Sequence, residues 1–171
     1  RAQRVATRIG YPVVLRPLVR ERGDAPPPVI RNDAGLQQAY EHWRGLGRRV
    51  MLEAWVEGDS YRILVANRQV LAVLGTVDGN GAATRVVTDR AHPSLLAAAA
   101  RVAAGVDAGL FLLTVVSRDI GVALQESGAA FVDLEPAPEL DAMLPEDSPL
   151  LAAAADAFIA WLFPPGERAR V

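Results

Sequence analysis

The chain contains no cysteine and no lysine, and only two of its 171 residues are histidine. Without cysteine it has neither disulfide bonds nor thiolate-ligated metal sites. All 18 basic residues are arginine, so every chemistry that requires a lysine amine, such as a Schiff base, is excluded. His42 and His92 each lack a second histidine nearby. A transition-metal site is therefore not expected.

Long hydrophobic runs and an excess of one charge are also missing. The formal net charge is −2, which gives no electrostatic reason to expect a nucleic acid or an anionic membrane as partner. The longest apolar run follows Leu95, is broken by Arg101 and Asp107, and is too short to span a bilayer. No signal-peptide pattern is present. We expect a cytoplasmic protein of one domain, or of one domain made of two lobes, and leave homo-oligomerisation open.

Residues 50–73 have the strongest strand pattern and predict three strands, with turns at residues 57–59 and 67–68. The other patterns predict strands at 13–15, 29–30, 109–116 and 129–134, helices at 1–9, 34–44, 92–105 and 149–163, and loops at 19–28 and 78–81. This order is typical of an α+β fold in which helices cover one face of each sheet. Because the chain opens within a helical pattern, we expect it to be a fragment of a longer protein.

Arg16 stands at the end of an apolar strand pattern, beside a loop. Its guanidinium could form paired, charge-assisted hydrogen bonds with a phosphate. The alternative is an arginine that leaves the core at a strand end to reach water. The spacing alone does not decide between these two interpretations.

Glu53 ends one predicted strand, and Arg62 lies inside another that is otherwise apolar. Glu53 could contact a hydroxyl or amine of a ligand. The strand holds the guanidinium of Arg62 on one face of the sheet, where it could contact an anion. The two side chains could instead pair with each other across the predicted hairpin. An exposed pair of that kind contributes only about 0.2–1 kcal/mol, so both interpretations stay open.

Asp133 and Glu135 are two positions apart in a predicted strand, so their carboxylates share one face of the sheet. Two carboxylates held so close favour a cation between them. Oxygen ligands with spare coordination positions suit Mg²⁺ that also bridges to nucleotide phosphates. The alternative is a solvated acidic strand end.

Taken together, four segments resemble motifs of the ATP-grasp superfamily, most closely the ATP-grasp domain of cyanophycin synthetase-type amide ligases. Residues 9–17 (IGYPVVLRP) are similar to the family's IGYPVVVKP, and residues 51–65 (MLEAWVEGDSYRILV) to its VxVExxxxGxDYRxLVV. Residues 88–109 resemble TDxxHPxxxxxAxxAAxxxGLDxxG, and residues 131–139 (FVDLEPAPE) stand in the place of xxEVNxxPG. The four motifs occur in the family's order and extend over nearly the whole chain.

The resemblance implies an ATP-grasp fold of two small lobes, residues 1–52 and 53–163 with a tail at 164–171, and a nucleotide cleft between the lobes. It implies that Arg16 contacts phosphate and that Arg62 approaches the triphosphate or an acyl phosphate. Asp133 and Glu135 would hold Mg²⁺. The residues implied to face adenine, partly through backbone groups, are Glu53, Ala54, Trp55 and Val56, and Glu57 would approach the ribose.

The chain departs from the family pattern in two places that matter for chemistry. Residues 20–28 (RERGDAPPP) replace a glycine-rich phosphate loop, and Pro26, Pro27 and Pro28 remove backbone N–H groups that such a loop would offer. The metal-ligating Asp expected after Gly109 corresponds to Phe111, and Glu139 replaces the final Gly of the metal motif.

Two functions are therefore predicted as alternatives. The first is an ATP-dependent ligase that joins a carboxylate to an amine through an acyl phosphate, with ATP and Mg²⁺ as cofactors and with other domains of a parent protein as partners. The second is an inactive ATP-grasp-like module that serves nucleotide binding, regulation or protein assembly.

Overall fold

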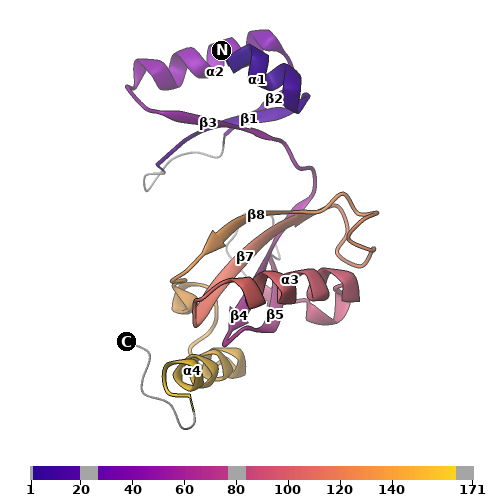
Figure 1. Cartoon of the computed structure of the whole chain (residues 1–171), viewed down its shortest axis with the longest axis vertical. Helices are drawn as coiled ribbons and strands as arrows, with labels where there is room; N and C mark the ends of the chain where they lie inside the picture. The colour runs from indigo at the N-terminus through magenta and orange to yellow at the C-terminus, as the bar shows by residue number, and fades with distance from the viewer. Residues whose placement is uncertain (1, 20–26, 77–83, 165–171) are drawn as a thin grey trace. The chain divides into compact units, whose positions relative to one another are not determined.

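The computed structural model of this chain describes residues 2–19, 27–76 and 84–164. The chain divides into two units, Arg1–Trp55 and Val56–Val171, and each unit has its own antiparallel sheet (Figure 1). The expected α+β class with two antiparallel sheets is thereby confirmed. The predicted loops at 19–28 and 78–81 and the predicted tail lie mostly or wholly outside the described residues.

The first unit is a three-stranded sheet covered by two helices on one face. Its elements are α1 (Ala2–Ile9), β1 (Val13–Pro17), β2 (Val29–Ile30), α2 (Asp33–Gly45) and β3 (Val50–Ala54), with the strand order β2-β1-β3. Alternate residues of β1 point to the helices: Val13 and Leu15 are buried with Ala6 of α1 and Leu36 of α2. The other face of the same strand carries Arg16.

Polar contacts fix the start of α2. The cap is a side chain: Asn32 Oδ1 accepts the backbone N–H of Gly35 at 2.9 Å, which satisfies one of the donors left unpaired at a helix start. The hydroxyl of Tyr11 donates to Asp33 Oδ1 at 2.6 Å. This hydrogen bond to a carboxylate raises the pKa of Tyr11 to about 12. The contact ties the segment before β1 to the first turn of α2.

The second unit contains a five-stranded sheet in the order β6-β5-β4-β7-β8. Its strands are β4 (Asp59–Ala66), β5 (Gln69–Thr76), β6 (Thr84–Val86), β7 (Leu110–Ser117) and β8 (Ala130–Glu135). The other elements are the 3₁₀ turns η1 (Thr88–Arg90) and η2 (Leu140–Ala142) and the helices α3 (Pro93–Gly105) and α4 (Pro149–Leu162). The predicted turn joining β4 to β5 is present, with positive φ at Asn67 and Arg68, as a two-residue hairpin turn requires.

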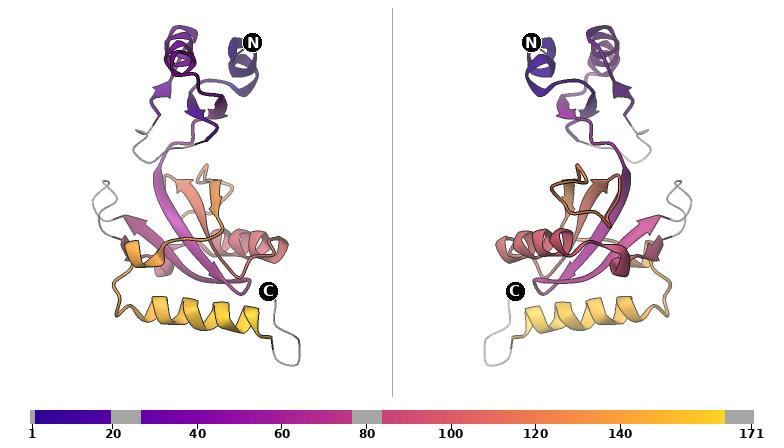
Figure 2. Two further views of the ribbon diagram at one scale, coloured as in Figure 1. Left: turned by 90° about the vertical axis from the view of Figure 1, so that its left-hand side faces the viewer. Right: turned by 90° about the vertical axis from the view of Figure 1, so that its right-hand side faces the viewer.

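The central strands β4 and β7 are covered on both faces. On one face Ile63, Phe111 and Leu113 pack with Leu95 of α3. On the opposite face Leu64 and Leu112 pack with Leu140 of η2 and Ala154 of α4, so this sheet has a helix on each side (Figure 2). Cover on both faces explains why these strands are nearly continuous apolar runs rather than alternating ones.

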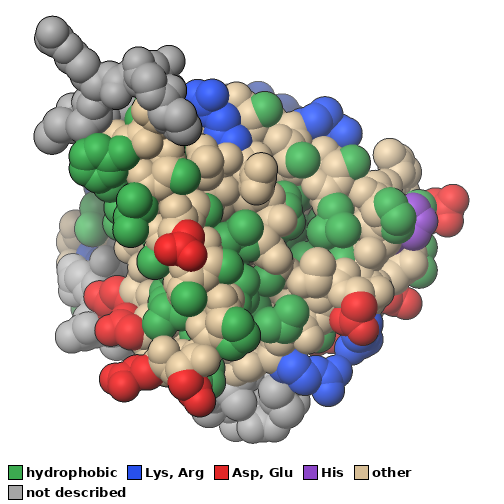
Figure 3. Space-filling view, turned by 90° about the horizontal axis from the view of Figure 1, so that it is seen from below, with side chains coloured by type: hydrophobic (Ala, Val, Ile, Leu, Met, Phe, Trp, Pro, Cys, Tyr) green, Lys and Arg blue, Asp and Glu red, His purple; other side chains and the backbone are tan. Residues whose placement is uncertain are grey.

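Helix α4 keeps hydrophobic side chains exposed although it packs on the sheet. Its one charged residue is Asp156. Ile159 is 53% exposed, and Phe163, just past the end of the helix, is 61% exposed. Figure 3, which views the molecule from the side of α4, shows hydrophobic side chains gathered on this surface. None of the described helices is long and apolar enough to cross a membrane.

The prediction for residues 50–73 was right about the strands and wrong about their pairing. β3 pairs with β1 in the first sheet, whereas β4 and β5 pair in the second. Glu53 and Arg62 are therefore not cross-strand neighbours on one hairpin. Three short elements, β6, η1 and η2, were not predicted, because each has only three residues and too few positions to show a period.

Candidate functional site

Arg62, Thr114 and Asp133 form one row across the second sheet. Arg62 of β4 is paired with Thr114 of β7, and Thr114 is paired with Asp133 of β8. Directly paired residues of neighbouring antiparallel strands point to the same face. One row further along, Glu135 is paired with Leu112, which brings the second carboxylate to that face. One guanidinium and two carboxylates therefore share a face, and all lie within the second unit.

The row is open to solvent at its charged ends. Arg62, Asp133 and Glu135 are exposed, while Thr114 between them is half-buried. Arg62 Nη1 lies 3.0 Å from the sulfur of Met143, so its position is fixed by the segment just after η2. Within residues 2–19, 27–76 and 84–164, neither carboxylate forms an ion pair. Both are available to a cation.

The prediction that Phe111 occupies the position of the metal-ligating Asp is wrong. Alternate residues of β7 point to opposite faces, and Phe111 lies on the α3 face, where it is fully buried in the core. The residue paired with Asp133 is Thr114. On this face β7 presents Thr114 opposite Asp133 and Leu112 opposite Glu135, so the polar side chain that β7 adds beside the two carboxylates is a hydroxyl.

Two carboxylates and one hydroxyl define what this face can bind. Mg²⁺ in nucleotide sites is commonly held by one or two carboxylates, with water and phosphate oxygens completing the shell, so Asp133 and Glu135 fit such an ion. In the described part of the chain, no group of three or more His, Asp or Glu side chains is placed to hold a metal. The donor set suits a magnesium–phosphate ligand better than a metal bound by protein alone.

Arg16 and Glu53 form a two-point ion pair in the first unit. Arg16 Nη2 donates to Glu53 Oε1 at 2.9 Å, and Arg16 Nε lies against Oε2. The residues belong to paired strands, where Glu53 faces Val14, so the contact is diagonal across β1 and β3. Glu53 thus has Arg16 as its partner instead of Arg62. The pairing also neutralises part of the positive charge that Arg16 would offer to a phosphate.

We expect a double-mutant cycle on Arg16→Gln and Glu53→Gln to give a coupling free energy of about 1 kcal/mol. The side chains are 26% and 34% exposed, and a partly buried two-point pair exceeds the typical exposed one. Urea unfolding of the two single variants and the double variant measures this coupling. The matched control is Arg118→Gln with Glu57→Gln, because that pair is 69% and 68% exposed. Equal coupling in the two cycles would contradict the expectation.

The segment predicted to face a nucleotide, residues 53–57, already uses several of its polar groups. The backbone N–H of Trp55 donates to the carbonyl of Pro12 at 3.0 Å, so its carbonyl is the backbone group left for a ligand. Glu57 accepts a hydrogen bond from Arg118 Nη2 at 2.6 Å. Ala54 is exposed and Val56 is half-buried. The predicted contacts of these residues with adenine and ribose stay predictions.

Comparison with known proteins gives a partial sequence match. No protein-family model matches the chain. Cyanophycin synthetase from Trichormus variabilis is 34% identical over 79 residues, which are 44% of this chain and 9% of that protein. The chain thus matches a small part of that relative's length.

Solved structures match over nearly the whole chain. A RimK domain protein from Sphaerobacter thermophilus, described as ATP-grasp, covers 94% of this chain and 54% of its own, with a TM-score of 0.60 and 19% identity. The chain has the ATP-grasp fold. The ATP-grasp ligase PsnB, complexed with a phosphomimetic variant of a minimal precursor, Mg and ADP, covers 93% of this chain and 48% of its own, with a TM-score of 0.63 and 14% identity.

Within this ATP-grasp fold, the sequence pattern indicated most of the polar row but missed one member of it and one residue that contacts it. It singled out Arg62, Asp133 and Glu135, because a charged residue in an apolar strand and paired carboxylates stand out locally. It missed Thr114, which looks like an ordinary strand residue. It also missed Met143, which contacts Arg62 from 81 residues away in the chain. No local pattern reports either contact.

Proposed function

We propose that this chain is the ATP-grasp domain of an ATP-dependent carboxylate–amine ligase. The observation that carries the proposal is the row of Arg62, Thr114 and Asp133 with Glu135 on the same face. In such a ligase the terminal phosphoryl group of ATP passes to a carboxylate, and an amine then displaces phosphate from the acyl phosphate, forming the C–N bond. The sequence similarity to cyanophycin synthetase and the shared fold with PsnB support this class of reaction.

The residues have separate roles in the proposal. Asp133 and Glu135 hold Mg²⁺, which would neutralise charge on the phosphates. Arg62, fixed by Met143, is the catalytic cation: it contacts the phosphoryl oxygens, where charge is stabilised during transfer. Arg16 is proposed as a further phosphate contact. The residues proposed to bind adenine and ribose are Glu53, Ala54, Trp55, Val56 and Glu57.

An inactive ATP-grasp-like module is the second candidate, and two observations favour it. The residues of β7 paired with Asp133 and Glu135 are Thr114 and Leu112, so neither adds a third carboxylate to the group. The charge of Arg16 is partly neutralised by Glu53. Such a module would bind a nucleotide or a partner domain of a parent protein without transferring a phosphoryl group.

Thermal unfolding with ATP, with and without Mg²⁺, tests the proposed site. At a hundredfold excess over its dissociation constant, ATP should add about 2.7 kcal/mol, which corresponds to a rise of roughly 5–10 °C for a chain of this size. We expect this rise to require Mg²⁺ and to be lost in Asp133→Asn/Glu135→Gln. Arg62→Gln should reduce it. Because two negative charges are removed, the matched control is Glu126→Gln/Asp156→Asn at exposed positions of the second unit.

The outcomes separate the two candidates. Mg²⁺-dependent stabilisation accompanied by ADP release in the presence of a carboxylate and an amine supports the ligase. If ATP raises the unfolding temperature but no ADP is released with any mixture of amino acids added, the binding module is supported. If millimolar ATP with Mg²⁺ leaves the unfolding temperature of the wild type unchanged, the nucleotide site is refuted.

A further inference from the structure

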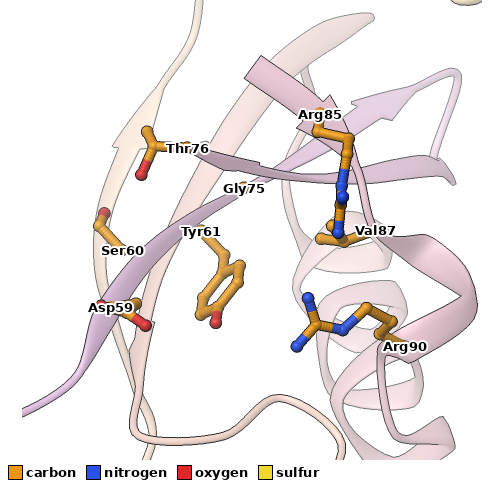
Figure 4. Close-up of a pocket in the computed structure, with 8 residues that line it drawn as sticks. All are labelled: Asp59, Ser60, Tyr61, Gly75, Thr76, Arg85, Val87 and Arg90. Atoms are coloured by element: carbon orange, nitrogen blue, oxygen red, sulfur yellow. The ribbon is translucent and has the colours of Figure 1, made fainter. Parts of the chain in front are cut away.

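A polar pocket lies on the face of the second sheet opposite the row of Arg62, Thr114 and Asp133. Its volume is about 340 Å³, which is within the range of small-molecule sites. Tyr61 of β4 is paired with Gly75 of β5, and Gly75 with Arg85 of β6. Because Tyr61 is adjacent to Arg62, the two side chains point to opposite faces. The lining residues are Asp59, Ser60, Tyr61, Gly75, Thr76, Arg85, Val87 and Arg90 (Figure 4).

Two arginines dominate the charge of this pocket. Arg85 comes from β6 and Arg90 from the end of η1. Figure 4 shows the guanidinium of Arg90 extending toward the ring of Tyr61 and that of Arg85 extending toward Val87, with Asp59 on the other side of the ring. Neither arginine forms an ion pair or hydrogen bond with another described residue of the chain. Two cations therefore line the hollow, and Asp59 is the one carboxylate among its lining residues.

The ring of Tyr61 forms the buried wall between the opposite charges. The residue is 9% exposed, and a Cβ atom at position 75 would lie 3.4 Å from its ring, so Gly75 leaves the space beside it open. Desolvation, followed by the negative charge of Asp59, raises the pKa of Tyr61. The phenol therefore keeps its proton at neutral pH and can donate a hydrogen bond to an anion.

We propose that this pocket binds a small molecule through a phosphoryl group held by Arg85 and Arg90, with the Tyr61 hydroxyl as a further donor. Planar guanidinium groups match phosphate oxygens with paired, charge-assisted hydrogen bonds, and two of them balance the double negative charge of a phosphate monoester. The pocket shares no residue with the proposed Mg²⁺ site, so this inference does not depend on the proposed function.

Calorimetric titration with inorganic phosphate, in sodium chloride of matched ionic strength, tests the proposal. We expect saturable binding that weakens about tenfold in Arg85→Gln and in Arg90→Gln, and disappears in the double variant. Tyr61→Phe should weaken binding severalfold while keeping the ring. Arg101→Gln removes an exposed arginine of α3 and should change nothing. Asp59→Asn should strengthen binding severalfold, because it removes a like charge from the pocket.

Each alternative has its own result. Equal phosphate binding by the wild type and the Arg85/Arg90 double variant would overturn the proposal, as would the absence of saturable binding in the wild type. Acetate bound as tightly as phosphate would point to a carboxylate ligand instead. Circular dichroism confirms that each variant is folded. In a folded Arg85/Arg90 variant, the Mg²⁺-dependent rise in unfolding temperature with ATP should persist. In Asp133→Asn/Glu135→Gln, the calorimetric binding of phosphate should persist. Failure of one site is therefore distinguishable from failure of the other.

Discussion

Phe111→Asp is expected to unfold the second unit, whereas Thr114→Asp is expected to leave it folded. Phe111 is fully buried in the core against α3. Removing its ring costs about 3–5 kcal/mol, and an unpaired buried carboxylate adds several more. The sum is comparable to the whole stability of a domain. Urea unfolding followed by circular dichroism measures the difference between the two variants.

Thr114→Asp should also create a stronger divalent-ion site. Its carboxylate would stand between Arg62 and Asp133, so attraction to the guanidinium opposes repulsion from Asp133, and Mg²⁺ should stabilise the variant more than the wild type. We expect about tenfold tighter Mg²⁺ binding than in the wild type, because each added anionic ligand strengthens an oxygen site. Thr114→Asn is the control of equal size without charge. If the Asp and Asn variants respond equally to Mg²⁺, the proposed position of the ion is wrong.

Gly58→Ala is expected to destabilise the second unit by about 3 kcal/mol or more. Gly58 has φ +140°, and a Cβ atom there would lie 2.2 Å from the carbonyl carbon of Ser117. That carbon is backbone at the end of β7, where Ser117 is paired with Asp59, so it cannot move aside without breaking the pairing. Strain in a conformation favoured by glycine and the overlap each cost about 1–3 kcal/mol. Thermal and urea unfolding measure the loss.

The control for Gly58→Ala is Gly105→Ala at the end of α3. An added Cβ meets no atom within 4 Å at that position, and alanine is the better helix former by up to about 1 kcal/mol. This variant should therefore be neutral or slightly more stable than the wild type. A loss in Gly58→Ala no larger than the change in Gly105→Ala would show that β7 can yield at this point.

Most of the secondary structure followed from local sequence. The Asn32 cap, the proline that opens α3 at Pro93, and the turn at Asn67 each act within a few residues, so their chemistry can be recognised along the chain. The period of two within a strand likewise placed Asp133 and Glu135 on one face. The two carboxylates were therefore correctly predicted to share a face.

Strand pairing and helix cover required the tertiary structure. Periodicity states which residues share a face, but not which strand lies alongside or which helix covers that face, because those contacts join residues far apart in the chain. For this reason the partner of Glu53 proved to be Arg16, and the residue opposite Asp133 proved to be Thr114. The same reason applies to the pocket of Arg85 and Arg90, whose short elements have no period of their own. Local sequence therefore specified most of the elements and their polar residues, and the long-range pairing of strands decided which of those residues meet.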